Sequence, residues 1–230
     1  MNFLCHALPY MDQPLMAVST GIPDWLSVVD RKIRARRRSA EEFLDSDDDE
    51  LRSVATGIIG HLDDDRWFHG TQAFVQTNMQ FAVELRDLLP GDDGFRPTFV
   101  GHILIEMILD ALWIRDDAGM ADRYYATLAG LPADTIERCV NRVTGRPTNK
   151  LSGVIERFTQ VRFLYDYLDD DRLMMRLNQV MNRVGLTELP DQVKNWLPRA
   201  MDVVESRRLE LLSPPESPFP FPSFETKSNE

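Results

Sequence analysis

The sequence predicts an all-α protein, and three observations support that prediction. Apolar residues recur at steps of three and four along several long segments of the 230-residue chain. Alternation of apolar and polar residues, the pattern of a half-buried strand, is sparse. Glycine or proline follows several of the periodic segments, where a helix would stop. We therefore expect helices that pack on one another around a shared core.

The expected helices follow from these patterns in chain order. Residues 51–69 place apolar side chains at helical spacing and end at Gly70. Residues 98–114 are almost wholly apolar, which predicts a buried central helix. The other predicted helices lie at 72–89, 119–130, 133–143, 152–184 (one long or broken helix) and 191–212.

Composition predicts one domain over residues 1–212. With 43% hydrophobic and 27% charged residues, the chain suits a globular unit that is long enough to bury its own core. Residues 213–230 differ, because five prolines stand there among serine, glutamate and phenylalanine. Such a composition is a poor helix or strand and predicts a flexible C-terminal tail.

Charge and cysteine content argue against a dedicated nucleic-acid binder and against a disulfide-rich secreted protein. Lysine and arginine number 26 against 37 aspartates and glutamates, a net charge of -11 that is atypical of a dedicated nucleic-acid binder. The two cysteines, Cys5 and Cys139, cannot build a disulfide framework, so the cytoplasm is the expected compartment. No run reaches the roughly 18 to 20 apolar residues of a membrane span. The first twenty residues lack a signal peptide's basic start and apolar stretch, so we expect no stable membrane insertion.

Two neighbouring segments are strongly charged. Residues 31–38 hold six basic residues in eight, and residues 41–50 hold seven acidic residues in ten. One interpretation is a solvated segment that neutralises itself. The other is a patch that attracts anions near a phosphate site.

The predicted central helix carries a line of ionisable side chains. His102, Glu106 and Asp110 stand at i, i+4 and i+8, and each step drifts by only about 40° around a helix, so all three share one face. Two carboxylates on one buried face are costly unless a cation compensates them. A metal ion is the compact solution, and histidine with carboxylate suits Zn, Mn or Fe.

The helix predicted at 51–69 repeats the pattern with His61, Asp65 and His69. Four helical residues rise about 6 Å, so neighbouring members can reach one ion, whereas the two histidines are too far apart to share one easily. A middle Asp65 between two metal positions fits this spacing. Two such helices facing each other would hold two divalent ions roughly 3.5–4 Å apart. The alternative is a polar core network in which each histidine donates to a carboxylate.

Three further residues complete the candidate site. His6 is the one histidine outside the two triplets, and we include it as a metal ligand. Asp24 follows a Gly-Ile-Pro turn and is expected either to cap a helix or to bind metal. Asp64 and Asp110 are the candidate catalytic carboxylates, which would orient the nucleophile or protonate the leaving group.

The chain also resembles a known family in the order of its motifs. Residues 1–6, MNFLCH, look like the MNFLAH start of the acyl carrier protein phosphodiesterase family. Residues 21–24 resemble that family's early Gly…Asp segment, and residues 60–65 resemble its histidine–aspartate motif. The helix at 98–114 is similar to a later family helix that carries an aspartate and a histidine.

This resemblance implies an HD-like helical bundle around a metal pocket. It also implies a metal-dependent phosphodiesterase that cleaves the bond between 4′-phosphopantetheine and a serine of acyl carrier protein, which would be the partner. The chain departs from the family at Leu62, where the family has arginine, and at His69, where it tends to have aspartate. The His-x-x-x-Asp and His-x-x-x-Glu pairs are also similar to zinc-dependent phospholipase C proteins. A non-catalytic, metal-stabilised helical scaffold is the remaining alternative.

Overall fold

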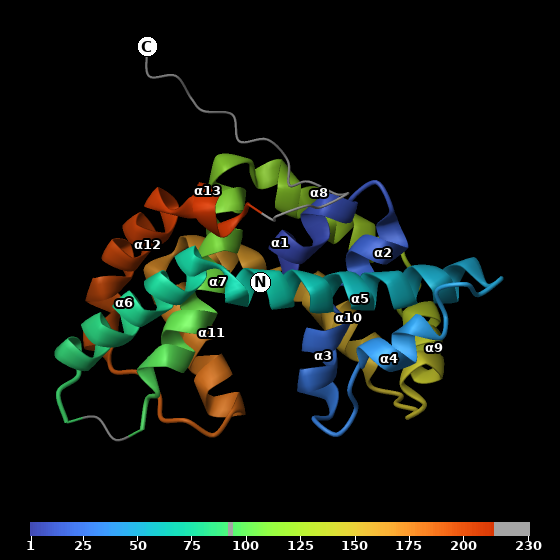
Figure 1. Cartoon of the computed structure of the whole chain (residues 1–230), viewed down its shortest axis with the longest axis horizontal. Coiled ribbons are helices and arrows are strands. Elements are labelled where there is room, and N and C mark those ends of the chain that lie inside the picture. The colour runs from blue at the N-terminus through green and yellow to red at the C-terminus, as the bar shows by residue number, and fades with distance from the viewer. Residues whose placement is uncertain (92–93, 214–230) are drawn as a thin grey trace, which may run out of the picture.

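The computed structural model describes residues 1–91 and 94–213, and within them the chain forms helices and no strand (Figure 1). The all-α prediction is confirmed. The α-helices are α1 (Phe3–Ala7), α2 (Pro14–Ser19), α3 (Ile22–Val29), α4 (Arg37–Glu41), α5 (Asp49–Gly70), α6 (Gln72–Leu88), α7 (Pro97–Asp116), α8 (Ala118–Ala129), α9 (Ala133–Thr144), α10 (Leu151–Val161), α11 (Asp170–Arg183), α12 (Leu197–Ser206) and α13 (Arg208–Leu211). The 3-10 helices are η1 (Leu8–Tyr10), η2 (Phe163–Leu168) and η3 (Asp191–Trp196).

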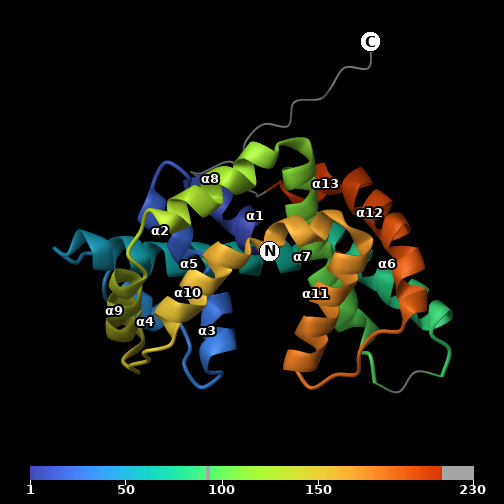
Figure 2. The same ribbon diagram turned by 180° about the vertical axis from the view of Figure 1, so that it is seen from behind.

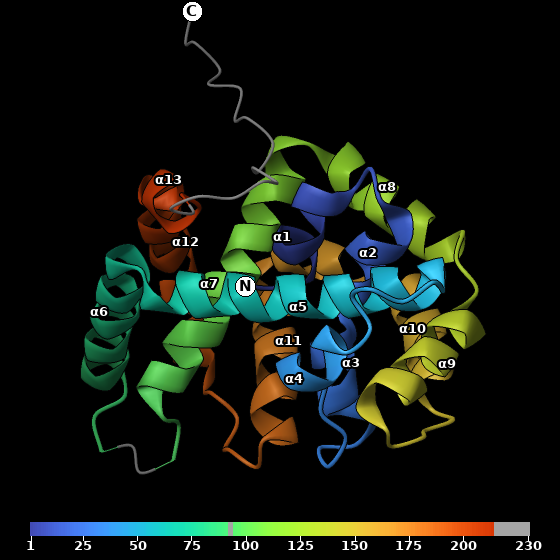
Figure 3. The same cartoon turned by 45° about the vertical axis from the view of Figure 1, so that its right-hand side comes forward.

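Two long helices, α5 and α7, cross near the middle of the molecule, close to the N-terminus (Figure 1). Helices α1 and α2 lie on one side of α5, and α3 and α4 lie on the other (Figure 3). Seen from behind, α3, α9 and α10 form one flank of the molecule, and α6, α11 and α12 form the other (Figure 2). The two crossing helices therefore form the frame on which the remaining helices pack.

Two glycines allow the central helices to approach their neighbours closely. A Cβ atom at Gly57 of α5 would stand 2.6 Å from the carbonyl oxygen of Met16 in α2. A Cβ atom at Gly101 of α7 would stand 2.7 Å from Oδ1 of Asn78 in α6. A larger side chain at Gly57 would push α2 and α5 apart, whereas one at Gly101 would first displace the Asn78 side chain and crowd Phe81.

Helix α7 is the core helix that its sequence predicts. Pro97–Asp116 is long and apolar enough to cross a membrane by length and composition, but 67% of its apolar window is buried inside the fold. Buried side chains from Met1 to Leu212 belong to a single hydrophobic cluster. Burial of this extent, at about 25 cal/mol for each Å² of apolar surface, is the main term that stabilises the fold.

The structure divides both of the long helices predicted in the C-terminal half. The segment 152–184 breaks at Arg162, whose φ of 51° is left-handed, and α11 begins after Asp169, whose side chain accepts a hydrogen bond from the backbone N–H of Arg172. The segment 191–212 becomes η3, α12 and α13. Proline at the start of α12 supplies no N–H to continue the preceding helix. The predicted tail falls almost entirely on residues 214–230, outside the described part of the chain.

Candidate metal centre

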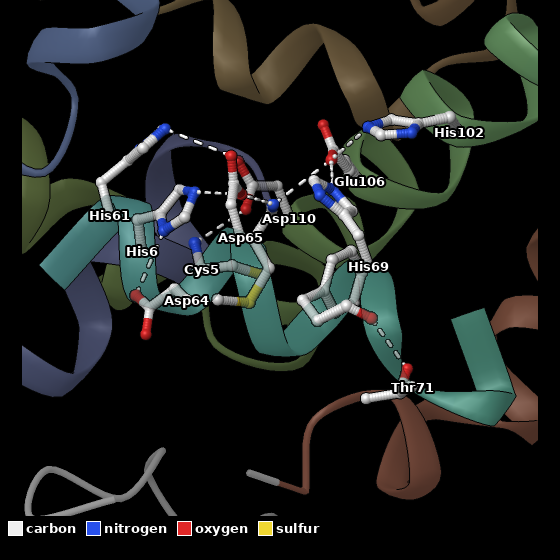
Figure 4. A network of polar contacts seen from close by, with 12 residues as sticks. Cys5, His6, His61, Asp64, Asp65, His69, Thr71, His102, Glu106 and Asp110 are labelled. Carbon is white, nitrogen blue, oxygen red and sulfur yellow. Dashed lines mark hydrogen bonds and ion pairs between the residues drawn. The ribbon is translucent and has the colours of Figure 1, made fainter. Parts of the chain in front are cut away.

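Six of the predicted ligands come together in two groups of three, and each group holds two histidines and one carboxylate (Figure 4). Within each group the candidate ligand atoms all lie within 4.8 Å of one another, so each group could hold a metal ion. The first group consists of His6, His61 and Asp65. The second group consists of His69, His102 and Glu106.

The first group is largely buried. His6 Nε2 lies 3.3 Å from Asp65 Oδ1, and His61 Nε2 lies 3.4 Å from Asp65 Oδ2. The two imidazole rings stack with their centroids 4.1 Å apart. Nδ1 of His6 contacts Oδ2 of Asp64 at 3.2 Å, so Asp64 orients this histidine from the side away from Asp65.

The second group is more open to solvent. Oε1 of Glu106 lies 2.9 Å from Nε2 of His69 and 3.0 Å from Nε2 of His102. The side chains of His69 and His102 are 29% and 33% exposed, whereas the His6 side chain is fully buried. Phe74 packs edge-on against the ring of His102. Ligands from solution would therefore reach the second group first.

The sequence interpretation paired these residues partly wrongly. Asp65 was expected to lie between metal positions at His61 and at His69 along α5. In the structure it contacts His61 and His6, and His69 contacts Glu106. Helix α7 supplies His102 and Glu106 to the second group, while Asp110 belongs to neither group. The reason is that α1 inserts His6 beside α5, which single-helix spacing cannot reveal.

Asp110 holds α1 in place. Its two carboxylate oxygens accept hydrogen bonds from the backbone N–H groups of Leu4, at 3.1 Å, and Cys5, at 2.9 Å. These N–H groups belong to the first turn of α1, where Asn2 provides no side-chain cap. Asp110 is fully buried, and burial raises its pKa to about 6. The two N–H groups lower the pKa, but burial outweighs them. The contact thereby fixes the position of His6.

The α-amino group of Met1 connects the two groups. It donates to Oδ1 of Asp65 at 2.7 Å and to Oε1 of Glu106 at 3.2 Å. Burial lowers its pKa, but the two carboxylates outweigh burial and raise the pKa to about 11. Both carboxylates therefore lie within hydrogen-bonding distance of one nitrogen atom, which places the two groups side by side.

The carboxylates dominate the electrostatics of the site. Burial opposes ionisation of Asp65, yet its contacts with His6, His61 and the Met1 ammonium hold its pKa well below the usual range. Burial and the Met1 ammonium lower the pKa of His6, but Asp64 and Asp65 outweigh them and raise it to about 9. Metal binding through His6 would therefore displace a proton at neutral pH.

The buried histidine atoms fit a metal ion. Nε2 of His6 is buried and forms no well-aligned hydrogen bond to a described residue, although Asp65 Oδ1 lies 3.3 Å from it. Buried polar atoms of this kind are normally satisfied. A divalent ion at the first group would satisfy His6 Nε2, which faces Asp65. Imidazole and carboxylate together suit Zn, Mn or Fe.

Asp24 does not cap α3. Gly21 is the residue before that helix, and Asp24 lies inside its first turn. Burial raises the pKa of Asp24, while the nearby His61 and His6 lower it. Its carboxylate therefore lies beside the first group, although it is not one of the three clustered ligands.

Sequence reasoning missed the Met1 amino group and the contact between Asn2 and Tyr167. Nδ2 of Asn2 donates to the hydroxyl of Tyr167 at 3.1 Å and so ties the start of the chain to η2. The only available signal was the apolar start MNFL, which indicates that the first residues are buried. Which residues they contact depends on tertiary packing.

Comparisons with models of known protein families, with curated proteins and with solved structures find no match for the chain. The likeness to the acyl carrier protein phosphodiesterase family therefore stays a prediction, as does the HD-like arrangement of the helices. The structure itself provides two neighbouring groups of residues, each of which could hold a metal ion.

Proposed function

We propose that the chain is a metal-dependent phosphodiesterase with a centre for two divalent ions. The observation that carries this proposal is the adjacency of two His₂–carboxylate groups, whose carboxylates Asp65 and Glu106 meet at the amino group of Met1. Pairs of divalent ions are common in enzymes that cleave phosphate esters. Three protein ligands per ion also leave positions for water and substrate.

His6, His61 and Asp65 would hold one ion, and His69, His102 and Glu106 would hold the other. When bound, such ions supply Lewis acidity toward water and toward the phosphoryl oxygens of the substrate. The partial exposure of His69 and His102 gives a substrate access to the second group. The burial of His6 shields the first group from bulk water.

The remaining carboxylates have separate roles in this proposal. Asp64 orients His6 through the 3.2 Å contact at Nδ1, which directs Nε2 toward Asp65. Asp110 positions α1 through its two backbone hydrogen bonds. Asp24 remains available to accept or donate a proton, because no hydrogen bond from another described residue engages its carboxylate and burial raises its pKa. We therefore assign proton handling to Asp24 in place of Asp64 and Asp110.

The substrate class is a phosphodiester, and the sequence resemblance makes 4′-phosphopantetheinylated acyl carrier protein the first candidate. Acyl carrier protein is acidic, and this chain carries a net charge of -11. A protein substrate of that kind requires local positive charge on the enzyme surface to offset the repulsion.

The proposal is tested with the metal content of the purified protein and its hydrolysis of bis-p-nitrophenyl phosphate. Asp65→Asn removes a ligand charge from the centre, whereas Asp63→Asn on the same helix removes only an exposed ion pair with Arg37. We expect Asp65→Asn to lose metal and activity together and Asp63→Asn to retain both. A wild-type protein that binds metal but leaves both this diester and phosphopantetheinylated acyl carrier protein intact would refute the proposed activity.

A further inference from the structure

A cavity of about 740 Å³ lies at the corner where α5 ends and α6 begins. Trp67 of α5, Gln72 and Gln76 of α6, and Ser213, which follows α13, are among the residues that line it. None of the six candidate metal ligands lines this cavity. The cavity is therefore a second concave feature of the molecule, and the proposed activity gives it no role.

Several N–H groups at the cavity are not engaged by the fold. The side chains of Arg66, Gln72 and Gln76 line the cavity and form no ion pair or hydrogen bond with any residue in the ranges 1–91 and 94–213. The indole N–H of Trp67 likewise donates to none of these residues. All four side chains carry N–H donors. An occupant that presents carbonyl oxygens would therefore find donors on the α5 side and on the α6 side of the cavity.

Exposed apolar side chains continue the cavity along α6. Gln76, Met79 and Val83 stand at steps of three and four residues and therefore share one face of the helix. The side chains of Met79 and Val83 are 62% and 50% exposed, and that of Val75 is 46% exposed. Exposed apolar side chains gathered on one surface mark a site that binds a partner.

The segment that leaves this cavity has a composition that fits it. Ser213 lines the cavity, and residues 214–230 follow it in the chain. Residues 218–224, PFPFPSF, hold three prolines and three phenylalanines. Proline carries no N–H group, so such a segment presents carbonyl oxygens with few donors, and proline-rich segments bind grooves lined by aromatic side chains. The phenylalanine rings supply apolar partners for Met79 and Val83.

The segment is also long enough to cover the exposed side chains of α6. Gln72 and Val83 are eleven residues apart, which is about 17 Å along an α-helix. The eight residues from 214 to 221 span roughly 25 Å in a polyproline helix. Because the segment is attached at the cavity itself, its effective concentration there is on the order of millimolar. This attachment favours the chain's own segment over a free peptide or the segment of a second copy.

We propose that residues 218–224 bind this surface of their own molecule, with phenylalanine rings packed on Trp67, Met79 and Val83. The free N–H groups of Arg66, Trp67 and the two glutamines then donate to backbone carbonyl oxygens of the segment. Burial of the exposed apolar side chains stabilises the contact. The inference does not rest on the proposed phosphodiesterase activity, because no candidate metal ligand takes part in the contact.

Photo-crosslinking of the full chain tests where the segment binds. Phe221 is replaced by p-benzoylphenylalanine, which attaches to nearby C–H bonds on irradiation, and the attachment point is mapped by mass spectrometry. We expect an intramolecular product with the attachment at Trp67, Met79 or Val83. Attachment elsewhere on the body, or only between two molecules, would overturn the proposal.

Chymotrypsin provides a second measurement that leaves the segment unaltered. Phe219 and Phe221 each precede a proline, whereas Phe224 precedes Glu225, so cleavage in this part of the chain occurs after Phe224. Release of residues 225–230 reports how often the segment is free, because fast-exchanging contacts are cleaved in proportion to their open population.

The double variant Met79→Gln/Val83→Gln removes the apolar surface of α6 at two exposed positions. We expect it to be cleaved after Phe224 about fivefold faster than the wild type, with an unchanged melting temperature. Met175→Gln, at a 43% exposed position of α11, is the matched control and should be cleaved at the wild-type rate. Equal rates in all three proteins, or protection that grows with protein concentration, would overturn the intramolecular contact.

Discussion

Oδ1 of Asp110 accepts a hydrogen bond from the backbone N–H of Cys5 at 2.9 Å, which joins α7 to α1 across 105 positions of sequence. Oδ2 accepts from Leu4 in the same way. A carboxylate on the central helix thus takes the place of a local cap on α1. Because His6 follows directly, the geometry of the first metal group depends on a residue that belongs to neither group.

Asp110→Ala is expected to destabilise the fold and weaken the first group. The substitution leaves two buried N–H groups of α1 without partners, which costs about 2–3 kcal/mol. Urea unfolding should show the loss of stability, and metal analysis should show reduced occupancy. Glu156→Ala, at an exposed position of α10, is the control and should change neither measurement.

The two metal groups should be separable by mutation. His102→Ala removes a half-exposed ligand of the second group, and His61→Ala removes a buried ligand of the first. Each variant should bind about one divalent ion where the wild type binds two. Elemental analysis of the dialysed proteins measures this directly. Loss of all metal from both variants would instead indicate a single shared ion.

Stability at low pH should depend on Glu84, far from the centre. Its carboxylate accepts hydrogen bonds from Arg199 and Trp196 and so joins α6 to the C-terminal helices. The bonds from Arg199, with further bonds from Gln80 and Trp196, lower the pKa of Glu84 from 4.5 to about 2. Because the folded-state pKa is depressed, this stabilisation is present above pH 4.5 and is lost as the pH falls toward 2.

Glu84→Gln should therefore be less stable than the wild type at pH 7 by about 1 kcal/mol, a value reduced for the solvent exposure of Arg199. At pH 2 the two proteins should differ little. Urea unfolding at both pH values checks this. A constant difference at both pH values would show that the charge of Glu84 is not the cause.

Close helix packing should make Gly57 sensitive to the smallest substitution. In Gly57→Ala the new methyl group would meet the carbonyl oxygen of Met16 at 2.6 Å, so α2 and α5 must separate at a cost of about 1–3 kcal/mol. Gly153→Ala, in α10, meets nothing within 4 Å and should instead gain about 0.5–1 kcal/mol from helix propensity. Thermal unfolding of the two variants should shift in opposite directions.

Local sequence patterns account for the helices that frame the site. The segments predicted at 51–69 and 98–114 correspond to α5 and α7, because periodic apolar residues and terminal glycine or proline act within a few turns of a helix. The same spacing correctly placed His61 and Asp65 in contact, since residues four apart share a helix face. Breaks such as Arg162 were not located, because a left-handed residue other than glycine leaves little trace in sequence.

Contacts between helices account for what sequence could not assign. His6 joins His61, and Glu106 joins His69, only because α1 and α7 pack against α5. Asp110 has the same helical register as Glu106 but meets backbone N–H groups of α1 in place of a histidine. The spacing of Asp110 along α7 is that expected of a metal ligand, but the packing of α1 against it makes it an acceptor for backbone N–H groups.

Anomalous X-ray diffraction from crystals grown with Zn²⁺ or Mn²⁺ tests the two-ion centre most directly. We expect two anomalous peaks, one in contact with His6, His61 and Asp65 and one in contact with His69, His102 and Glu106. Met1 should then no longer bridge Asp65 and Glu106 through its amino group. A map with no anomalous density at either group, and with the ammonium still between the two carboxylates, would contradict the two-ion centre.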